Sequence, residues 1–521
     1  MYSRGLIGWM LPTSAIKLAC GAVGICSIAL LLALSVWVNG GNPGSGSQDT
    51  AADMAEEAPT GFNNTTNGFE AQAAFDADRT KFEEVEAIPD GLGPVYNATS
   101  CVSCHQNPVS GSSSQVSEIR AGHHAPDPDN AKKIIFVPSL GGSLIHQRAI
   151  NAAIQEHVLP EDTVRTLRMS NNLLGNGFVE VIPDEDILEF RDAHQPVGLK
   201  GLPVLVPVAV AAKTGAGGET VFVFVERIGR FGWKCQEASL LNFSAGAYLN
   251  EMGITNPLNP KENTSNGRDV SQFDQVPDPE DKVDPNDPDN KEHPFGDDVK
   301  AFTRFMRSTE APPRDFSLAA TKLVQDGEKI FRNNKTLGCA ICHRPDYTTP
   351  MAGTQITTLQ ADSTTMPGSD LAVVPKALGN KTFHPYSDFM LHDIGTGDGI
   401  AQTQHAQRPP RGVENLLKLP DDIVTRNGMV RVQARSPKGR KLALTDVPGL
   451  DQRTINKIRT APLWGLRVRP QLLHDGSALT IDEAIRRHQV RSKAGDVDLP
   501  RNFENLTDDE KKQLIAFLNS L

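Results

Sequence analysis

The longest apolar run in the chain lies near its N-terminus. It covers residues 18–38 without a charged side chain and follows Arg4 and Lys17. A run of this length can cross a bilayer as a helix, and positive charges before it keep the N-terminus in the cytoplasm. Ala33 and Ser35 also offer small residues for cleavage of a secretory signal. We therefore expect residues 1–48 to be either a membrane anchor with its tether or an export signal, and the rest of the chain to be periplasmic.

Helical periodicity is clearest in the last 200 residues. Leucine and phenylalanine recur at i, i+3, i+4 and i+7 over residues 514–521, after the capping box Thr507–Glu510. Val324, Gly327 and Phe331 have helical spacing just before residue 339. We expect these two helices to cross, as the first and last helices of small c-type cytochromes do.

Changes in composition divide the chain into segments. Two β-branched runs, 204–210 and 221–225, are bounded by Gly and Pro and predict a short strand pair. Otherwise we expect a mainly α protein with two cytochrome c-like domains and long loops. The predicted segments are 1–48, anchor or signal; 49–74, flexible linker; 75–257, first domain; 258–296, linker rich in Pro and Asp; and 297–521, second domain.

The net charge narrows the range of possible partners. The formal net charge is -11 and there is no long basic run, which argues against nucleic acid as a partner. An electron-donor or electron-acceptor protein with a basic surface fits better. The spacing of acids in the 258–296 segment lacks the Gly and the terminal Glu that a helix-loop-helix calcium site needs at fixed positions, so we interpret the segment as an acidic solvated loop.

Two CxxCH motifs carry the strongest chemical signal. They are Cys101-Val-Ser-Cys104-His105 and Cys339-Ala-Ile-Cys342-His343. In such a motif two cysteine sulfurs bond a haem, and the adjacent histidine becomes the proximal iron ligand. A zinc or redox pair is the alternative for a single CxxC. Two motifs behind an export segment predict two covalently bound haem c groups, with His105 and His343 as iron ligands.

A second protein ligand would close an iron to substrate. For the second haem we favour His488, because Ile481, Ala484, Ile485 and His488 share one helical face. His392 and His474 are the alternatives. For the first haem only His123, His124 and His146 are available, and Gly122-His-His-Ala-Pro is typical of a loop. The first iron is therefore expected to be open.

Several segments resemble the di-haem oxidoreductases, which are relatives of bacterial di-haem cytochrome c peroxidases. In those peroxidases one haem relays electrons and the other reduces peroxide. The segments that carry the resemblance are Gly91–His105, Gly175–Pro183, Gly229–Cys235, Tyr386–Gly395, Arg459–Gly465 and Leu472–Gly476.

The chain departs from the peroxidase pattern at three places. The family's distal methionine, fourteen residues after the histidine of the His-x-Gly turn, is replaced by His488, and imidazole in place of a thioether lowers the haem potential. Arg469-Pro-Gln471 stands where the peroxidases have a calcium-binding Thr-x-Pro, so calcium is not carried over. Cys235 replaces a small apolar residue and is read as a buried small side chain.

Together these features predict an exported di-haem oxidoreductase. We expect the second haem to accept electrons and the first to act on a small oxidant such as hydrogen peroxide. Peroxide cleavage needs a proton at the leaving oxygen, and Glu180 is the candidate acid. Trp233 and Trp464 are candidates for an electron path between the haems, although a tryptophan is more often simply a core aromatic. The alternatives are a pure electron-transfer cytochrome and an oxidase of protein or sulfur substrates.

Overall fold

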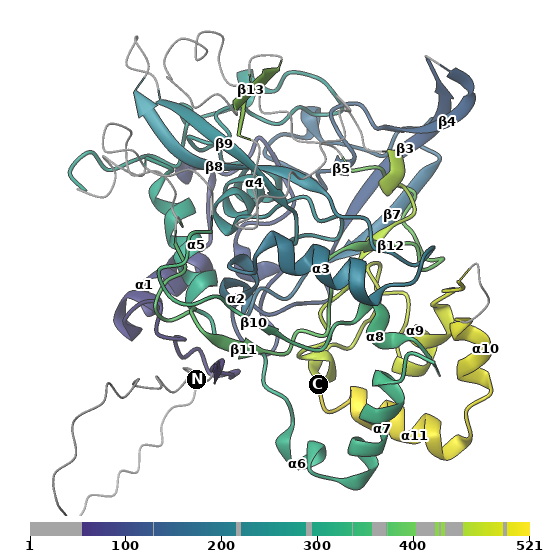
Figure 1. The fold of residues 1–521 in the computed structure, drawn as a ribbon. Helices are drawn as coiled ribbons and strands as arrows, with labels where there is room; N and C mark the ends of the chain where they lie inside the picture. Colours follow the sequence, from purple (N-terminus) through teal and green to yellow (C-terminus); the bar gives the residue numbers. More distant parts are fainter. Residues whose placement is uncertain are drawn as a thin grey trace, which may run out of the picture. The chain divides into compact units, whose positions relative to one another are not determined.

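Antiparallel strands form a large part of the first half of the fold, as the computed structural model shows (Figure 1). The model describes residues 55–128, 130–214, 220–287, 294–335, 337–356, 371, 373–402, 423–426, 429–432, 452–492 and 497–521. The longer strands are β3 (Ser117–Asp127), β4 (Asn130–Pro138), β7 (Val164–Met169), β8 (Leu205–Thr214) and β9 (Thr220–Ile228). The short strands used below are β12 (Leu391–His392), β13 (Ile423–Arg426), β14 (Met429–Val432) and β15 (Ile458–Arg459).

Two of the sheets are built around the antiparallel pairs β3–β4 and β8–β9. Strand β3 pairs with β4 on one edge and with β7 on the other. Strands β8 and β9 form a long antiparallel pair, which confirms the strand pair predicted near residues 204–225. Strand β14 extends that pair by running parallel to β9.

The expectation of a mainly α protein is wrong. The described chain is a mixture of helices and several sheets. The sequence around residues 117–169 alternates only weakly between apolar and polar side chains. Its strands are stabilised by pairing with one another, and the pattern within a single strand does not reveal that pairing. The Gly122-His-His-Ala-Pro segment, expected to be a loop, lies within β3 and pairs with β4.

The helices gather around the two CxxCH motifs. Their bounds are α1, Gln72–Glu83; α2, Asn176–Glu180; α3, Asp184–His194; α4, Leu240–Met252; α5, Asp297–Ser308; α6, Phe316–Ala319; α7, Lys322–Arg332; α8, Cys339–Cys342; α9, Ile481–Arg487; α10, Leu499–Glu504; and α11, Asp508–Leu518. Helices α1, α4 and α5 pack together, and α7 packs on α11.

The crossing of α7 and α11 confirms the predicted helix pair (Figure 1). Gly327 makes the close approach possible, because a Cβ at this position would lie 2.0 Å from the main-chain oxygen of Gln513. Phe331 and Phe517 pack nearby in a tilted arrangement, with ring centroids 5.1 Å apart. The Thr507 capping box also forms as predicted at the start of α11.

A second aromatic cluster lies between α1 and α5. Phe82 of α1 contacts Phe305 of α5 with ring centroids 4.6 Å apart, and Phe75 stacks on the same Phe305 ring at 5.4 Å. All three side chains are buried. This cluster forms the core beside the first CxxCH motif.

The predicted anchor at residues 1–48 and the first part of the 49–74 linker lie outside the described residues. No described helix has the length and apolar content needed to span a bilayer. Residues 54–521 form one compact unit, and the domain boundaries inside it remain predictions.

Replacing Gly327 by alanine should separate α7 from α11. Because the new methyl group meets main-chain atoms rather than a flexible side chain, we expect Gly327→Ala to lower the free energy of unfolding by about 1–3 kcal/mol. Gly246 of α4 is a matched control, because a Cβ there meets no atom within 4 Å. Gly246→Ala should stabilise by about 0.4–1 kcal/mol. Equal effects in urea titrations would show that the two helices do not depend on Gly327.

Candidate functional site

The first CxxCH motif forms a tight turn that ends in a partly buried histidine. Cys101–Ser103 is a single 3₁₀ turn, and His105 donates its main-chain N–H to the Cys101 carbonyl at 3.1 Å. The His105 Nδ1 lies 2.9 Å from the carbonyl oxygen of Asn171. A carbonyl only accepts, so Nδ1 carries the proton and Nε2 keeps its lone pair. Burial lowers the His105 pKa to about 4, which favours the neutral ring that a metal requires.

The second motif repeats this arrangement. Helix α8 is the CxxC turn, and the Nδ1 of His343 lies 2.8 Å from the carbonyl oxygen of Tyr386. Burial lowers the His343 pKa to about 4. Each proximal ring also has a phenylalanine neighbour: Phe82 is 6.4 Å from His105 and Phe331 is 6.3 Å from His343, between ring centroids. The two motifs therefore present equivalent imidazoles with a free Nε2.

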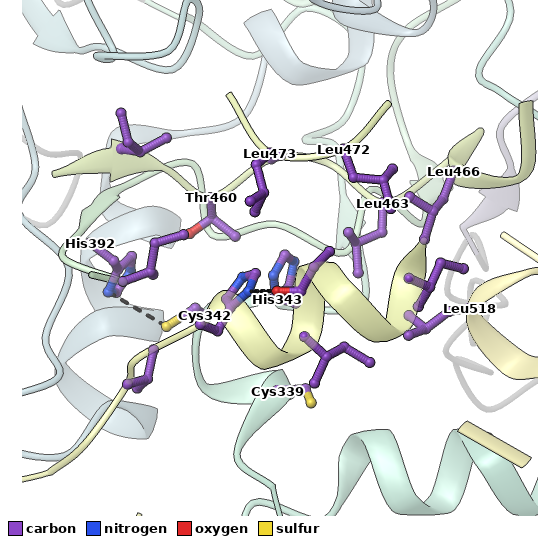
Figure 2. A pocket seen from close by; sticks show the side chains of 18 of the residues that line it. Cys339, Cys342, His343, His392, Thr460, Leu463, Leu466, Leu472, Leu473 and Leu518 are labelled. Carbon is purple, nitrogen blue, oxygen red and sulfur yellow. Dashed lines mark hydrogen bonds between the residues drawn. The ribbon is translucent and has the colours of Figure 1, made fainter. Parts of the chain in front are cut away.

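A large pocket surrounds the second motif. It has about 1240 Å³ of empty space, including its opening to solvent. Figure 2 shows His343 in this pocket, with Leu463, Leu472 and Leu473 on one side of it. The lining is mostly aliphatic, which suits a flat and largely apolar ligand.

His488 lines the same pocket. It follows directly after α9, and its Nδ1 lies 2.7 Å from the carbonyl oxygen of Ala484, so its Nε2 is also left without a proton. Burial lowers the pKa of His488. The structure thus brings His343 and His488 to one pocket with both rings anchored in the same way. Its assignment as the sixth ligand remains a prediction.

The alternative histidines, His392 and His474, also line this pocket. His392 is held at both nitrogens: Nε2 lies 2.7 Å from an Asp388 carboxylate oxygen, and Nδ1 lies 3.5 Å from the Cys342 sulfur (Figure 2). His474 packs edge-on against Trp233, with ring centroids 6.3 Å apart. Cys342, Asp388 and His392 are also residue types that bind zinc, and this alternative needs a test.

Two arginines supply positive charge to this mostly aliphatic pocket. Arg459 donates to the Gly232 carbonyl at 2.8 Å and to Asn171 Oδ1 at 3.0 Å. Arg469 lines the same pocket, and burial together with Arg459 lowers its pKa to about 10. No acidic side chain of the described residues pairs with Arg469.

These residues fit a haem group. The two histidines offer free nitrogens to an iron, the aliphatic walls suit a macrocycle, and the arginines match the two carboxylates on its edge. In particular, Arg469 is a partly buried cation whose counter-charge a propionate would supply.

A short segment links the two motifs. The Asn171 carbonyl accepts the proton of His105, while its side chain accepts from Arg459 in the second pocket. Two residues earlier, the Met169 carbonyl accepts the indole N–H of Trp233 at 2.7 Å, and Trp233 also lines that pocket. Trp464 lies in the core instead and packs against Phe383, with ring centroids 5.9 Å apart. Of the two tryptophans, Trp233 bridges the sites.

The histidines considered for the first haem are placed differently from one another. His146 is buried with both nitrogens engaged, by Glu156 at 2.8 Å and by the Asn250 carbonyl at 3.1 Å. His123 and His124 lie on β3 rather than on a loop. His146 therefore leaves no ring nitrogen for an iron, in contrast to His488.

Glu180 is buried at the end of α2. Its carboxylate accepts two hydrogen bonds from Arg307, at 2.7 and 2.9 Å, and one from the Leu240 main-chain N–H at 2.7 Å. Both oxygens are thus occupied by donors that keep their protons. The role of Glu180 as a proton donor stays a prediction, and the ion pair with Arg307 opposes that role.

A different pair of acids was missed by sequence reasoning. Burial and the neighbouring Glu118 raise the pKa of Glu251 to about 8, so Glu251 carries a proton at neutral pH. Arg120 holds Glu118 with hydrogen bonds of 2.7 and 3.0 Å. Both carboxyl groups act electrostatically on Cys104 of the first motif. They are 133 residues apart in sequence, so only the fold reveals the pair.

Cys235 is fully buried, and its thiol donates to the Phe389 carbonyl at 3.2 Å. Burial raises its pKa to about 12. A protonated, inaccessible thiol is unreactive, which favours the interpretation of Cys235 as a small core side chain.

Comparisons with known proteins identify the family. The chain is similar to Kuenenia stuttgartiensis hydrazine synthase (14% identity, covering 92% of this chain and 100% of that chain, TM-score 0.33). It is also similar to a diheme peroxidase from Burkholderia thailandensis (13% identity, 90% and 92% coverage, TM-score 0.32). Such scores carry no argument by themselves, and a search of curated proteins gave no significant match. Residues 132–408 match the family described as "Di-haem oxidoreductase, putative peroxidase". Because this match spans just over half of the chain, the protein belongs to the di-haem oxidoreductase family.

Proposed function

We propose that the protein is an exported di-haem c-type oxidoreductase that reduces a small oxidant such as hydrogen peroxide. Electrons are relayed at the His343 site and the oxidant is reduced at the His105 site. The observation that carries this proposal is the asymmetry between the sites: His343 shares its pocket with His488, whereas His146 of the first domain has both nitrogens engaged.

The family membership implies two haem groups, and the two CxxCH turns support their covalent attachment. When bound, haem supplies one-electron redox chemistry and, where its iron is open, a place for a small oxidant. Cys101, Cys104, Cys339 and Cys342 would hold the two groups. The main-chain carbonyls of Asn171 and Tyr386 keep the proximal rings in the tautomer that leaves Nε2 free.

The segment around Asn171 supports electron transfer between the sites. Trp233 contacts the second pocket and is fixed to Met169, two residues before the carbonyl that orients His105. Arg459 of the second pocket also connects the two sites, because it donates a hydrogen bond to the side chain of Asn171. These buried contacts hold the two sites in one rigid framework, which limits the reorganisation that each electron transfer requires.

Proton delivery at the first site is proposed to come from Glu251. It is the described carboxyl group that both acts on Cys104 and keeps its proton near pH 7. General acids work best when their pKa lies near the working pH. Asn97 fixes Glu251 through a hydrogen bond of 3.1 Å.

The location and partner follow from the sequence. Haem attachment to CxxCH takes place outside the bacterial cytoplasm, which agrees with the apolar N-terminal run. The net charge of -11 favours a redox partner with a basic surface.

A pyridine haemochrome assay should return two c-type haems per chain. The two CxxCH turns form independently, so Cys101→Ser and Cys339→Ser should each weaken one attachment and leave the other intact. Metal analysis is the counterpart of this assay. One haem with one zinc per chain would instead assign Cys342, Asp388 and His392 to a zinc site.

Replacing His488 by alanine should convert one haem from low-spin to high-spin, because one iron loses its second strong ligand. His488→Met should keep that iron low-spin and raise its reduction potential, since thioether ligation favours ferrous iron. His392→Ala is the control, and it should leave the spin state unchanged. If His392→Ala gives the high-spin signal and His488→Ala does not, the ligand is His392.

Glu251→Gln should slow peroxide turnover by about 10²–10⁴-fold. In the parent enzyme, turnover should fall as pH rises through about 8, because Glu251 then loses the proton it donates. This limb of the pH profile should be absent in Glu251→Gln.

Glu180→Gln separates the two candidate acids. It breaks a buried ion pair with Arg307, so we expect a loss of stability of about 3–5 kcal/mol with the pH limb retained. Loss of the limb in Glu180→Gln alone would restore Glu180 as the acid. A resting and a half-reduced enzyme that both ignore peroxide would instead support a pure electron-transfer cytochrome.

A further inference from the structure

Four acidic side chains converge in the segment between α4 and α5. They are Glu262, Asp274, Asp278 and Glu280, and each offers a carboxylate oxygen within 4.8 Å of the others. All four belong to the acidic segment 258–296, and Glu262 precedes the other three by at least twelve residues. The fold therefore gathers charges that a solvated loop would keep apart.

Three of these oxygens are buried without a partner. Both carboxylate oxygens of Glu262 and the Oε1 of Glu280 each expose less than 1 Å² and have no hydrogen-bond partner. Buried acceptors are nearly always satisfied, and an unpaired carboxylate is especially costly to bury. These oxygens therefore indicate a ligand that carries positive charge.

The described part of the chain supplies no such charge. Within the described residues, no lysine or arginine forms an ion pair with any of the four carboxylates. Burial and the charges of Glu280, Asp278 and Asp274 raise the pKa of Glu262 to about 9. Without a cation, this site must hold protons at neutral pH to relieve the repulsion.

We propose that Glu262, Asp274, Asp278 and Glu280 form a binding site for one calcium ion. Calcium binds oxygen ligands at about 2.3–2.6 Å, so oxygens on opposite sides of the ion lie about 4.6–5.2 Å apart. The carboxylate oxygens of the cluster all lie within 4.8 Å of one another, so one ion can contact all four residues. Magnesium, at about 2.0–2.1 Å, requires a smaller and more regular shell. Water and main-chain oxygens would complete the coordination.

The site would connect structures on the side of the first haem. Thr255, just after α4, donates its main-chain N–H to Glu280 at 2.7 Å. The next residue, Asp281, accepts the main-chain N–H groups of Asp298 and Val299 at 3.0 and 3.1 Å, and so caps α5. An ion at Glu280 therefore stabilises the junction of α4 with α5, the helix that packs beside Phe82.

The test uses the holoprotein after exchange into chelator-treated buffer. Metal analysis after addition of calcium should give one tightly held ion per chain, and calcium should raise Tm by about 2–5 °C when it is present in about 100-fold excess over Kd. Calcium displaces protons from the cluster when it binds. Without calcium, the carboxyl groups lose their protons and repel one another as pH rises towards about 9, so the Tm of the calcium-free protein should fall. The gain in Tm from calcium should grow over the same range.

Variants locate the ion. Glu262→Gln and Asp274→Asn should each weaken calcium binding by about 100-fold or more, because each removes a charged ligand. Glu161→Gln, which removes an exposed carboxylate elsewhere, should bind calcium like the parent. The proposal is overturned if calcium changes neither Tm nor metal content, if Glu262→Gln binds it normally, or if magnesium binds more tightly. The haem spectra report separately on the redox sites, and they should be unchanged by Glu161→Gln.

Discussion

The chemistry of this protein depends on holding two partly buried imidazoles in one tautomer. At each CxxCH turn a main-chain carbonyl accepts the Nδ1 proton, from Asn171 for His105 and from Tyr386 for His343. A carbonyl cannot reverse this polarity, so Nε2 keeps the lone pair that would bind an iron. Burial adds to the effect, because it lowers both pKa values and keeps the rings neutral. The rest of the fold places these two carbonyls.

The two sites are alike on the proximal side and differ elsewhere. Each has a phenylalanine from the preceding helix beside the histidine, and each helix packs against a partner, α5 for the first site and α11 for the second. The second pocket adds His488, Arg459 and Arg469 to a mostly aliphatic wall. The neighbourhood of the first motif instead carries an acid pair, Glu118 and Glu251. Such a division between an enclosed site and a proton-rich site suits an enzyme that separates electron relay from reduction of its oxidant.

The segment from Met169 to Asn171 joins these environments. One face of it orients His105, and the other accepts hydrogen bonds from Trp233 and Arg459 of the second pocket. A change in the packing around Arg459 in the second pocket therefore affects Asn171, which orients His105. This arrangement also explains why the buried Arg459 is tolerated: its guanidinium is satisfied by Gly232 and Asn171 rather than by an acid.

The sequence by itself determined what depends on neighbours along the chain. The two CxxCH turns, the α7 and α11 helices, the β8–β9 pair and the helical phase of His488 all follow from spacings of a few residues, where local geometry is decisive. It did not determine the β3–β4–β7 sheet, since these strands are stabilised by partners up to 52 residues away. The tertiary structure alone decided which charges meet: Arg307 with Glu180, Glu118 with Glu251, and Glu262 with the acids of the 274–280 segment. Electrostatic partners are set by distance in space, and a pattern along the chain carries no record of that distance.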